Sequence, residues 1–141
     1  MSITVSLEKL HQSSAALDDL SRLEDIPITL GFLFAKAINA TNAELAAFES
    51  ARKLKLEEVC KKDEHGNVAI AKDAKGNPTG KVDFLDKESE AKFAKEIDEM
   101  FKVEVELSIN QISQAKIETQ LKDTKGIKPA ILAQLSWLFF V

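Results

Sequence analysis

Apolar residues recur at helical spacing through the segment 28–62. Steps of three and four residues carry the pattern from Leu30 through Phe34 to Val59, which keeps one face of a helix apolar. Pro27 lies where a first helical turn tolerates proline, and Gly66 can close the helix in a left-handed conformation. A helix over 28–62 would be roughly 50 Å long, more than a small globule covers. It is either the core helix of a monomer or a helix whose exposed apolar length meets another subunit or partner.

The N-terminal segment predicts a strand followed by a shorter helix. Ile3, Val5 and Leu7 alternate with polar residues, which indicates a short strand. Leucines then recur at helical spacing as far as Leu23, and Ser6 is suited to be the N-cap. Because the connection to the long helix is short, we expect residues 1–65 to form a helical hairpin.

Residues 66–110 change from helical periodicity to alternation and back. Apolar residues at alternate positions on either side of the turn-rich loop Lys72 to Gly80 predict a β-hairpin with a mobile tip. A helix is predicted to follow Asp86, since acidic residues fill its first turn. Alternation over 101–110 then predicts a strand of a small antiparallel sheet that is wet on one face.

In residues 111–141, the pattern of 112–121 fits a helix or an extended segment equally. Pro129 is predicted to start a final helix whose core face carries four residues: Ile131, Leu132, Leu135 and Leu138. The whole chain, 1–141, is therefore predicted to be a single α+β domain. It combines a helical hairpin with one long central helix, a small antiparallel sheet (hairpin plus strand) and a C-terminal helix.

Composition and charge argue against several classes of partner. The formal charge is −4, and the 19 basic residues are interspersed with the 23 acidic ones, so no basic stripe for nucleic acid is present. The single cysteine, Cys60, fits a reducing cytosol and the role of a small buried hydrophobe. The apolar segment 131–141 is far shorter than the roughly 20 residues that span a bilayer, so no membrane partner is expected.

No residue pattern in the chain indicates catalysis or cofactor binding. The five glycines form no phosphate-binding loop, and two distant histidines with one cysteine make no recognisable zinc site. Asp63, His65 and Asn67 are spaced like the start of a calcium loop, but Val68 and Ala74 occupy the positions that need glycine and glutamate. We therefore expect a protein that is not an enzyme and that has no cofactor and no metal site.

Several short motifs in their order along the chain resemble a family of small proteins encoded in the tail-assembly region of long-tailed bacteriophages. The motifs are Ile3-x-Val5-x-Leu7-x-x-Leu10, Leu17-x-x-Leu20, Ile26-Pro27, Asn42-Ala-Glu44-Leu45, Phe48-Glu49-x-Ala51-Arg52, Lys62-Asp63-Glu64-His65-Gly66-Asn67, the run from Phe101 to Leu107, and Ile127-Lys-Pro129-Ala-Ile-Leu-Ala-Gln-Leu. The family includes proposed chaperones of the tape-measure protein. A departure is the very apolar ending Trp137-Leu-Phe-Phe-Val141, where the family leads us to expect a more polar sequence.

The resemblance implies a non-enzymatic phage assembly factor in the host cell cytoplasm. Its partner would be the tail tape-measure protein or another tail protein, whose apolar helical segments it would shield in a hydrophobic groove. We expect a homo-oligomer, and we expect the partner to contact five residues: Phe32, Leu33, Trp137, Phe139 and Phe140. Core packing is the alternative role for each of them. Two other functions stay open: a structural virion component of the tail or connector, and a regulator that binds a host protein or nucleic acid.

Overall fold

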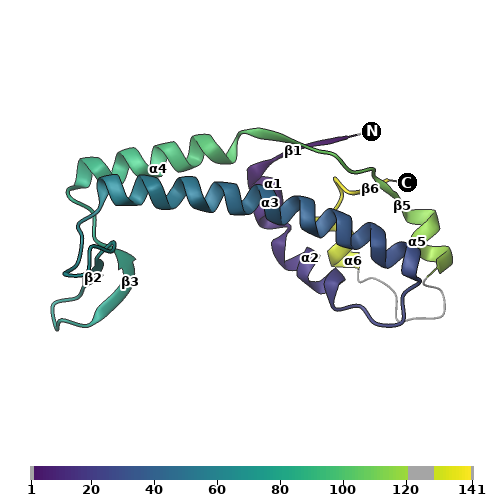
Figure 1. Ribbon diagram of the computed structural model, residues 1–141, viewed down its shortest axis with the longest axis horizontal. Helices are drawn as coiled ribbons and strands as arrows, with labels where there is room; N and C mark the ends of the chain where they lie inside the picture. The colour runs from purple at the N-terminus through teal and green to yellow at the C-terminus, as the bar shows by residue number, and fades with distance from the viewer. Residues whose placement is uncertain (1, 121–128, 141) are drawn as a thin grey trace. The chain divides into compact units, whose positions relative to one another are not determined.

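The computed structural model describes residues 2–120 and 129–140, and it confirms the α+β class with one long central helix (Figure 1). The elements in chain order are β1 (Ile3–Ser6), α1 (Leu7–Gln12), α2 (Ser14–Ser21), α3 (Ile28–Val59), β2 (Ile70–Lys72), β3 (Pro78–Val82), α4 (Lys87–Phe101), β4 (Glu104–Leu107), β5 (Ile112–Ser113), α5 (Gln114–Gln120), α6 (Pro129–Gln134) and β6 (Phe139–Phe140). They group into two compact units. Unit 1 comprises Met1–Ala46 and Lys102–Val141, and unit 2 comprises Ala47–Phe101. The single-domain organisation stays a prediction.

In unit 1, the N-terminal strand and its helix begin as the sequence predicts. Ser6 is the N-cap of α1, because its Oγ accepts a hydrogen bond of 3.2 Å from the backbone N–H of Lys9. β1 pairs with β4 in antiparallel register, with Ile3 opposite Leu107 and Val5 opposite Val105. The predicted strand of 101–110 is shorter than expected, since Phe101 still belongs to α4. It also lies in a sheet separate from the β-hairpin.

The predicted first helix is broken into α1 and α2 at Ser13. The Ser13 hydroxyl donates a hydrogen bond of 2.6 Å to the carbonyl of Lys9, and the Ser13 N–H lies within bonding distance of two carbonyls, those of Lys9 and Leu10. Such back-bonding by serine competes with the regular helical ladder and bends a helix. The buried residues Leu10, Ala16, Leu17 and Leu20 nevertheless keep the predicted apolar face.

The first half of α3 contributes one face to the core of unit 1. In Figure 1, α2 runs toward the loop of residues 22–27 and α3 returns in the opposite direction, as expected for a helical hairpin. Leu30, Phe34, Ala37 and Thr41 are buried at steps of three and four residues, which confirms the predicted face. The fully buried leucines that complete this core come from distant segments: Leu10, Leu20, Leu135 and Leu138.

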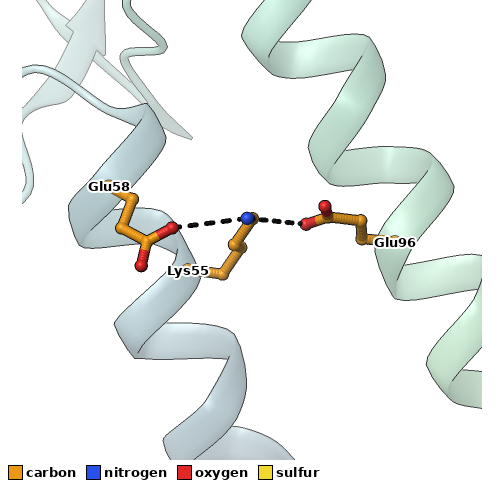
Figure 2. Close-up of polar contacts among 3 residues, drawn as sticks. All are labelled: Lys55, Glu58 and Glu96. Carbon is orange, nitrogen blue, oxygen red and sulfur yellow. Dashed lines mark hydrogen bonds and ion pairs between the residues drawn. The ribbon is translucent and has the colours of Figure 1, made fainter.

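In unit 2, the second half of α3 packs against α4. The rings of Phe48 and Phe101 stack with centroids 5.1 Å apart. Figure 2 shows the Lys55 ammonium of α3 between two carboxylates, 3.1 Å from Glu96 of α4 and 3.3 Å from Glu58 of its own helix. The hydrogen bonds to Glu96 and then to Glu58 raise the pKa of Lys55, so the ammonium stays charged at any ordinary pH.

The long helix ends at Val59 and not at Lys62, because the residues after Val59 enter the β structure. Backbone hydrogen bonds join three segments in a ring: Lys61 N–H to the carbonyl of Asp83 (2.8 Å), Asp83 N–H to that of Ala69 (2.9 Å), and Ala69 N–H to that of Lys61 (2.8 Å). Cys60 therefore lies opposite Phe84, just beyond the helix, and is buried as predicted. A helix to Lys62 would leave the edges of the other two segments unpaired.

The predicted hairpin β2–β3 is confirmed. Two turns of the same five-residue type occur here: one precedes the hairpin at residues 63–67, and the other closes it at residues 73–77. Asp63 Oδ1 accepts the N–H groups of His65 and Asn67, and Asp73 Oδ1 accepts those of Lys75 and Asn77, at 2.9 or 3.0 Å. Both turns have the sequence Asp-x-x-Gly-Asn, with the glycine at a φ of about 80° that favours glycine. Gly66 thus serves this turn and not the helix end. The tip of the hairpin is also shorter than predicted, since β3 already begins at Pro78.

The final helix, α6, is described from Pro129 onward and ends at Gln134, much earlier than expected. Residues 135–138 form turns, and β6 then pairs in parallel with β5, with Ile112 opposite Phe139. Leu135 and Leu138 are both buried and lie three residues apart, a spacing that also fits a helix, although they lie in turns. The undecided segment 112–121 is extended at Ile112–Ser113 and helical in α5, up to the last described residue, 120.

Candidate functional site

Two of the five predicted partner-binding residues present aromatic surface to solvent. Phe32, in the second turn of α3, is 62% exposed, and the Lys36 ammonium lies 5.6 Å from the centre of its ring. Phe140, in β6, is 45% exposed. Leu33 is half-buried. Phe32 and Phe140 are therefore the members of the predicted set with the most surface to offer a partner.

The other two aromatic residues of the predicted set help to anchor the C-terminal segment in unit 1. Phe139 is only 4% exposed, and its ring meets that of Phe34 edge to face at a centroid distance of 6.5 Å. Trp137 is half-buried, and its Nε1 donates a hydrogen bond of 2.9 Å to the Ser13 hydroxyl. Phe139 therefore packs in the core, which was the alternative role for these residues.

The hydroxyl of Ser13 joins α1 to the C-terminal stretch that carries Gln134 and Trp137. The oxygen accepts a hydrogen bond from the indole N–H of Trp137. The single hydroxyl proton is donated either to the carbonyl of Lys9 at 2.6 Å or to that of Gln134 at 3.2 Å. Ser13 has no exposed surface, so both roles of the hydroxyl are satisfied inside the protein. Sequence reasoning missed Ser13, and the only available signal was a serine pair within a helical pattern.

Replacing Ser13 by alanine is expected to release Trp137. The change removes the acceptor of the indole N–H, which would then need water, at a cost of about 1 kcal/mol in the free energy of unfolding. The chain has a single tryptophan, so its fluorescence reports on this one site. We expect a red shift of the emission maximum in Ser13→Ala and none in the control Ser14→Ala, whose residue is exposed. An unshifted spectrum would contradict the anchoring role of the hydroxyl.

Ile28 adds to the exposed surface near Phe32, and sequence reasoning did not single it out. It is 88% exposed and precedes Phe32 by four residues on α3, so the two side chains lie on the same face. Further exposed large apolar side chains are scattered over both units: Leu54, Ile70, Leu85 and Val103. Single residues of this kind are normal on protein surfaces, whereas a pair on one helix face forms a patch.

Unit 2 contains a cleft of about 740 Å³. Apolar side chains in its wall come from the hairpin and the segment that follows it, and charged ones of both signs surround them: Arg52, Lys81, Asp83, Asp86, Lys87 and Glu90. Asp86 is engaged as the N-cap of α4, because it accepts a hydrogen bond of 2.6 Å from the Ser89 N–H. This bond lowers the pKa of Asp86, which is the usual behaviour of a capping carboxylate and not of a proton donor.

The described residues include one thiol, that of Cys60, and hold no cluster of metal ligands. Burial first, and then the nearby carboxylate of Asp83, raises the pKa of the Cys60 thiol, so the thiolate needed for nucleophilic attack is disfavoured. Over residues 2–120 and 129–140, no three histidine, cysteine or acidic residues cluster where they could hold a metal ion. In the same ranges, no helix has the length and apolarity required to cross a membrane.

Comparisons of the chain with protein-family models, with curated proteins and with solved structures found no match.

Proposed function

We propose that this protein is a non-enzymatic assembly factor of a long-tailed bacteriophage. It would act in the host cell cytoplasm as a chaperone that shields apolar helical segments of the tail tape-measure protein. The sequence motifs quoted above support the family, and the exposed patch formed by Ile28 and Phe32 supports the mode of action.

That patch is the observation that carries the proposal. Two large apolar side chains with most of their surface in water are unfavourable unless a partner covers them, at about 25 cal/mol per Å² of apolar area. An amphipathic client helix would present a complementary apolar face at intervals of three and four residues. Aromatic anchors such as Phe32 commonly dominate contacts of this type.

Co-expression with overlapping fragments of the tape-measure protein from the same genome tests the proposal. We expect a pull-down to capture at least one apolar fragment, and light scattering of the complex to give its stoichiometry. Phe32→Glu should reduce capture by about tenfold or more, because it places a charge in the apolar contact. Leu85→Glu is the matched control, since it removes an apolar side chain that is 53% exposed in unit 2.

Failure to capture any fragment with the folded protein would contradict the chaperone proposal. Mass spectrometry of purified virions then decides whether the protein is a structural component of the particle.

A further inference from the structure

The outward face of α3 carries almost no charge over its first five turns. Lys36 and Glu44 are the only charged residues between Ile28 and Ala46, in a chain of which 30% is charged. Glu44 lies toward the core side of the helix, about 140° around from the exposed face at 100° per residue. Lys36 is exposed at the edge of the face, about 60° from Asn39, and the exposed positions nearer its centre are all uncharged: Ile28, Phe32, Ala35, Asn39, Ala43 and Ala46. Solvated helix faces are normally rich in charge, and depletion of charged residues is a property of the buried centre of interfaces.

Large and small side chains lie at equal distances on either side of Asn39, so the face of one copy is complementary to the same face of a second copy. Phe32 lies seven residues before Asn39 and Ala46 seven residues after it, while Ala35 and Ala43 lie four residues before and after. In an antiparallel pair of helices related by a two-fold axis through Asn39, each Phe32 would face Ala46 of the other copy. A large side chain on one helix would thus meet a small one on the other, as packing of ridges into grooves requires.

The polar groups on and beside this face fit the same arrangement. The two Asn39 amides would meet at the axis, where each can donate to and accept from the other. A single polar residue in an apolar helical seam is known to fix register. Lys36, three residues before the axis, would face Asn42 of the other copy, so no like charges would be brought together.

We propose that a second copy of this chain covers the outward face of α3, in an antiparallel dimer with its two-fold axis at Asn39. With the axis at Asn39, the two faces overlap from Phe32 to Ala46, roughly 22 Å of helix, and Ile28 lies beyond the overlap, opposite Ser50 of the other copy. An overlap of this length belongs to the small, transient class of interfaces. The dimer is therefore weak, with dissociation at about micromolar concentrations. It does not depend on the proposed function, although a client bound at Phe32 would compete with it.

Sedimentation of the full chain without any client measures the dimer directly. We expect a concentration-dependent shift from monomer to dimer, which Phe32→Lys weakens about tenfold or more. Ala46→Glu should weaken it as well. The double variant Phe32→Lys/Ala46→Glu should recover affinity, because the antiparallel pair places each new ammonium opposite a new carboxylate. Leu85→Lys, outside the face, should leave the dimer unchanged.

Cysteine crosslinking determines the orientation, and native Cys60 is buried and stays in place. Asn39→Cys alone should form a crosslinked dimer. Ala35→Cys should crosslink only when mixed with Ala43→Cys, since a disulfide needs Cα atoms within about 7 Å. A chain that stays monomeric at about 100 μM, well above dissociation constants in the micromolar range, would overturn the dimer. Efficient crosslinking of Ala35→Cys with itself would overturn the antiparallel arrangement. Neither result decides whether the chain captures a client, which the pull-down measures separately.

Discussion

Phe34→Ala is expected to lower the free energy of unfolding by about 3–5 kcal/mol, the cost of removing a large aromatic side chain from a packed core. Phe34 is almost fully buried, and its ring contacts that of Phe139. The truncation therefore leaves a cavity and also removes an edge-to-face contact of the C-terminal segment. Denaturation in urea, followed by circular dichroism and by the emission of Trp137, measures the loss.

Phe32→Ala is the matched control, two residues away on the same helix. Because Phe32 is largely exposed, its truncation should change stability by no more than about 0.5 kcal/mol when measured on the dilute monomer. Equal losses for the two variants would mean that α3 buries a different face from the one described.

Thr41→Val is expected to raise the free energy of unfolding by about 1–2 kcal/mol. Thr41 has no exposed surface, and its hydroxyl oxygen has no hydrogen-bond partner among the described residues. Valine has nearly the same shape and a similar helix propensity, so the substitution removes the cost of the unpaired hydroxyl without leaving a cavity.

Thermal unfolding compares this variant with Thr29→Val, which alters an exposed threonine of the same helix and should have almost no effect. A loss of stability in Thr41→Val would show that the hydroxyl has a partner, such as a buried water molecule, in solution.

Local patterns predicted most of the fold, and long-range contacts account for the errors. The Ser6 cap, the start of α3 and the β-hairpin depend on neighbours in the sequence, and all three were predicted. The predicted end of α3 at Lys62 was wrong because Lys61 pairs with Asp83, more than twenty residues away in the sequence. The sequence pattern of Leu135 and Leu138 could not show that β6 pairs with Ile112–Ser113.

The exposure of the predicted partner-binding residues could be predicted only where it depends on local sequence patterns. Exposure of Phe32 follows from helical periodicity, since it falls on the face opposite Leu30, Phe34 and Ala37. Burial of Phe139 depends on the ring of Phe34, and the neighbouring Trp137 is held by the Ser13 hydroxyl. Both partners lie more than a hundred residues away in the sequence. The antiparallel complementarity around Asn39 was present in the sequence, but it becomes visible only when exposed positions are separated from buried ones.

Stacking of Phe48 on Phe101 has a consequence for the order of folding. Unit 2 is continuous in the chain, whereas unit 1 is assembled from a segment before it and a segment after it. Closing a flexible loop of roughly 55 residues would cost unit 1 on the order of 3–4 kcal/mol in chain entropy. Once unit 2 has folded, the two stacked rings hold its ends together, and β1 and β4 can pair without that cost. If unit 2 folds first, the pairing of strands a hundred residues apart in the sequence therefore needs no further loop closure.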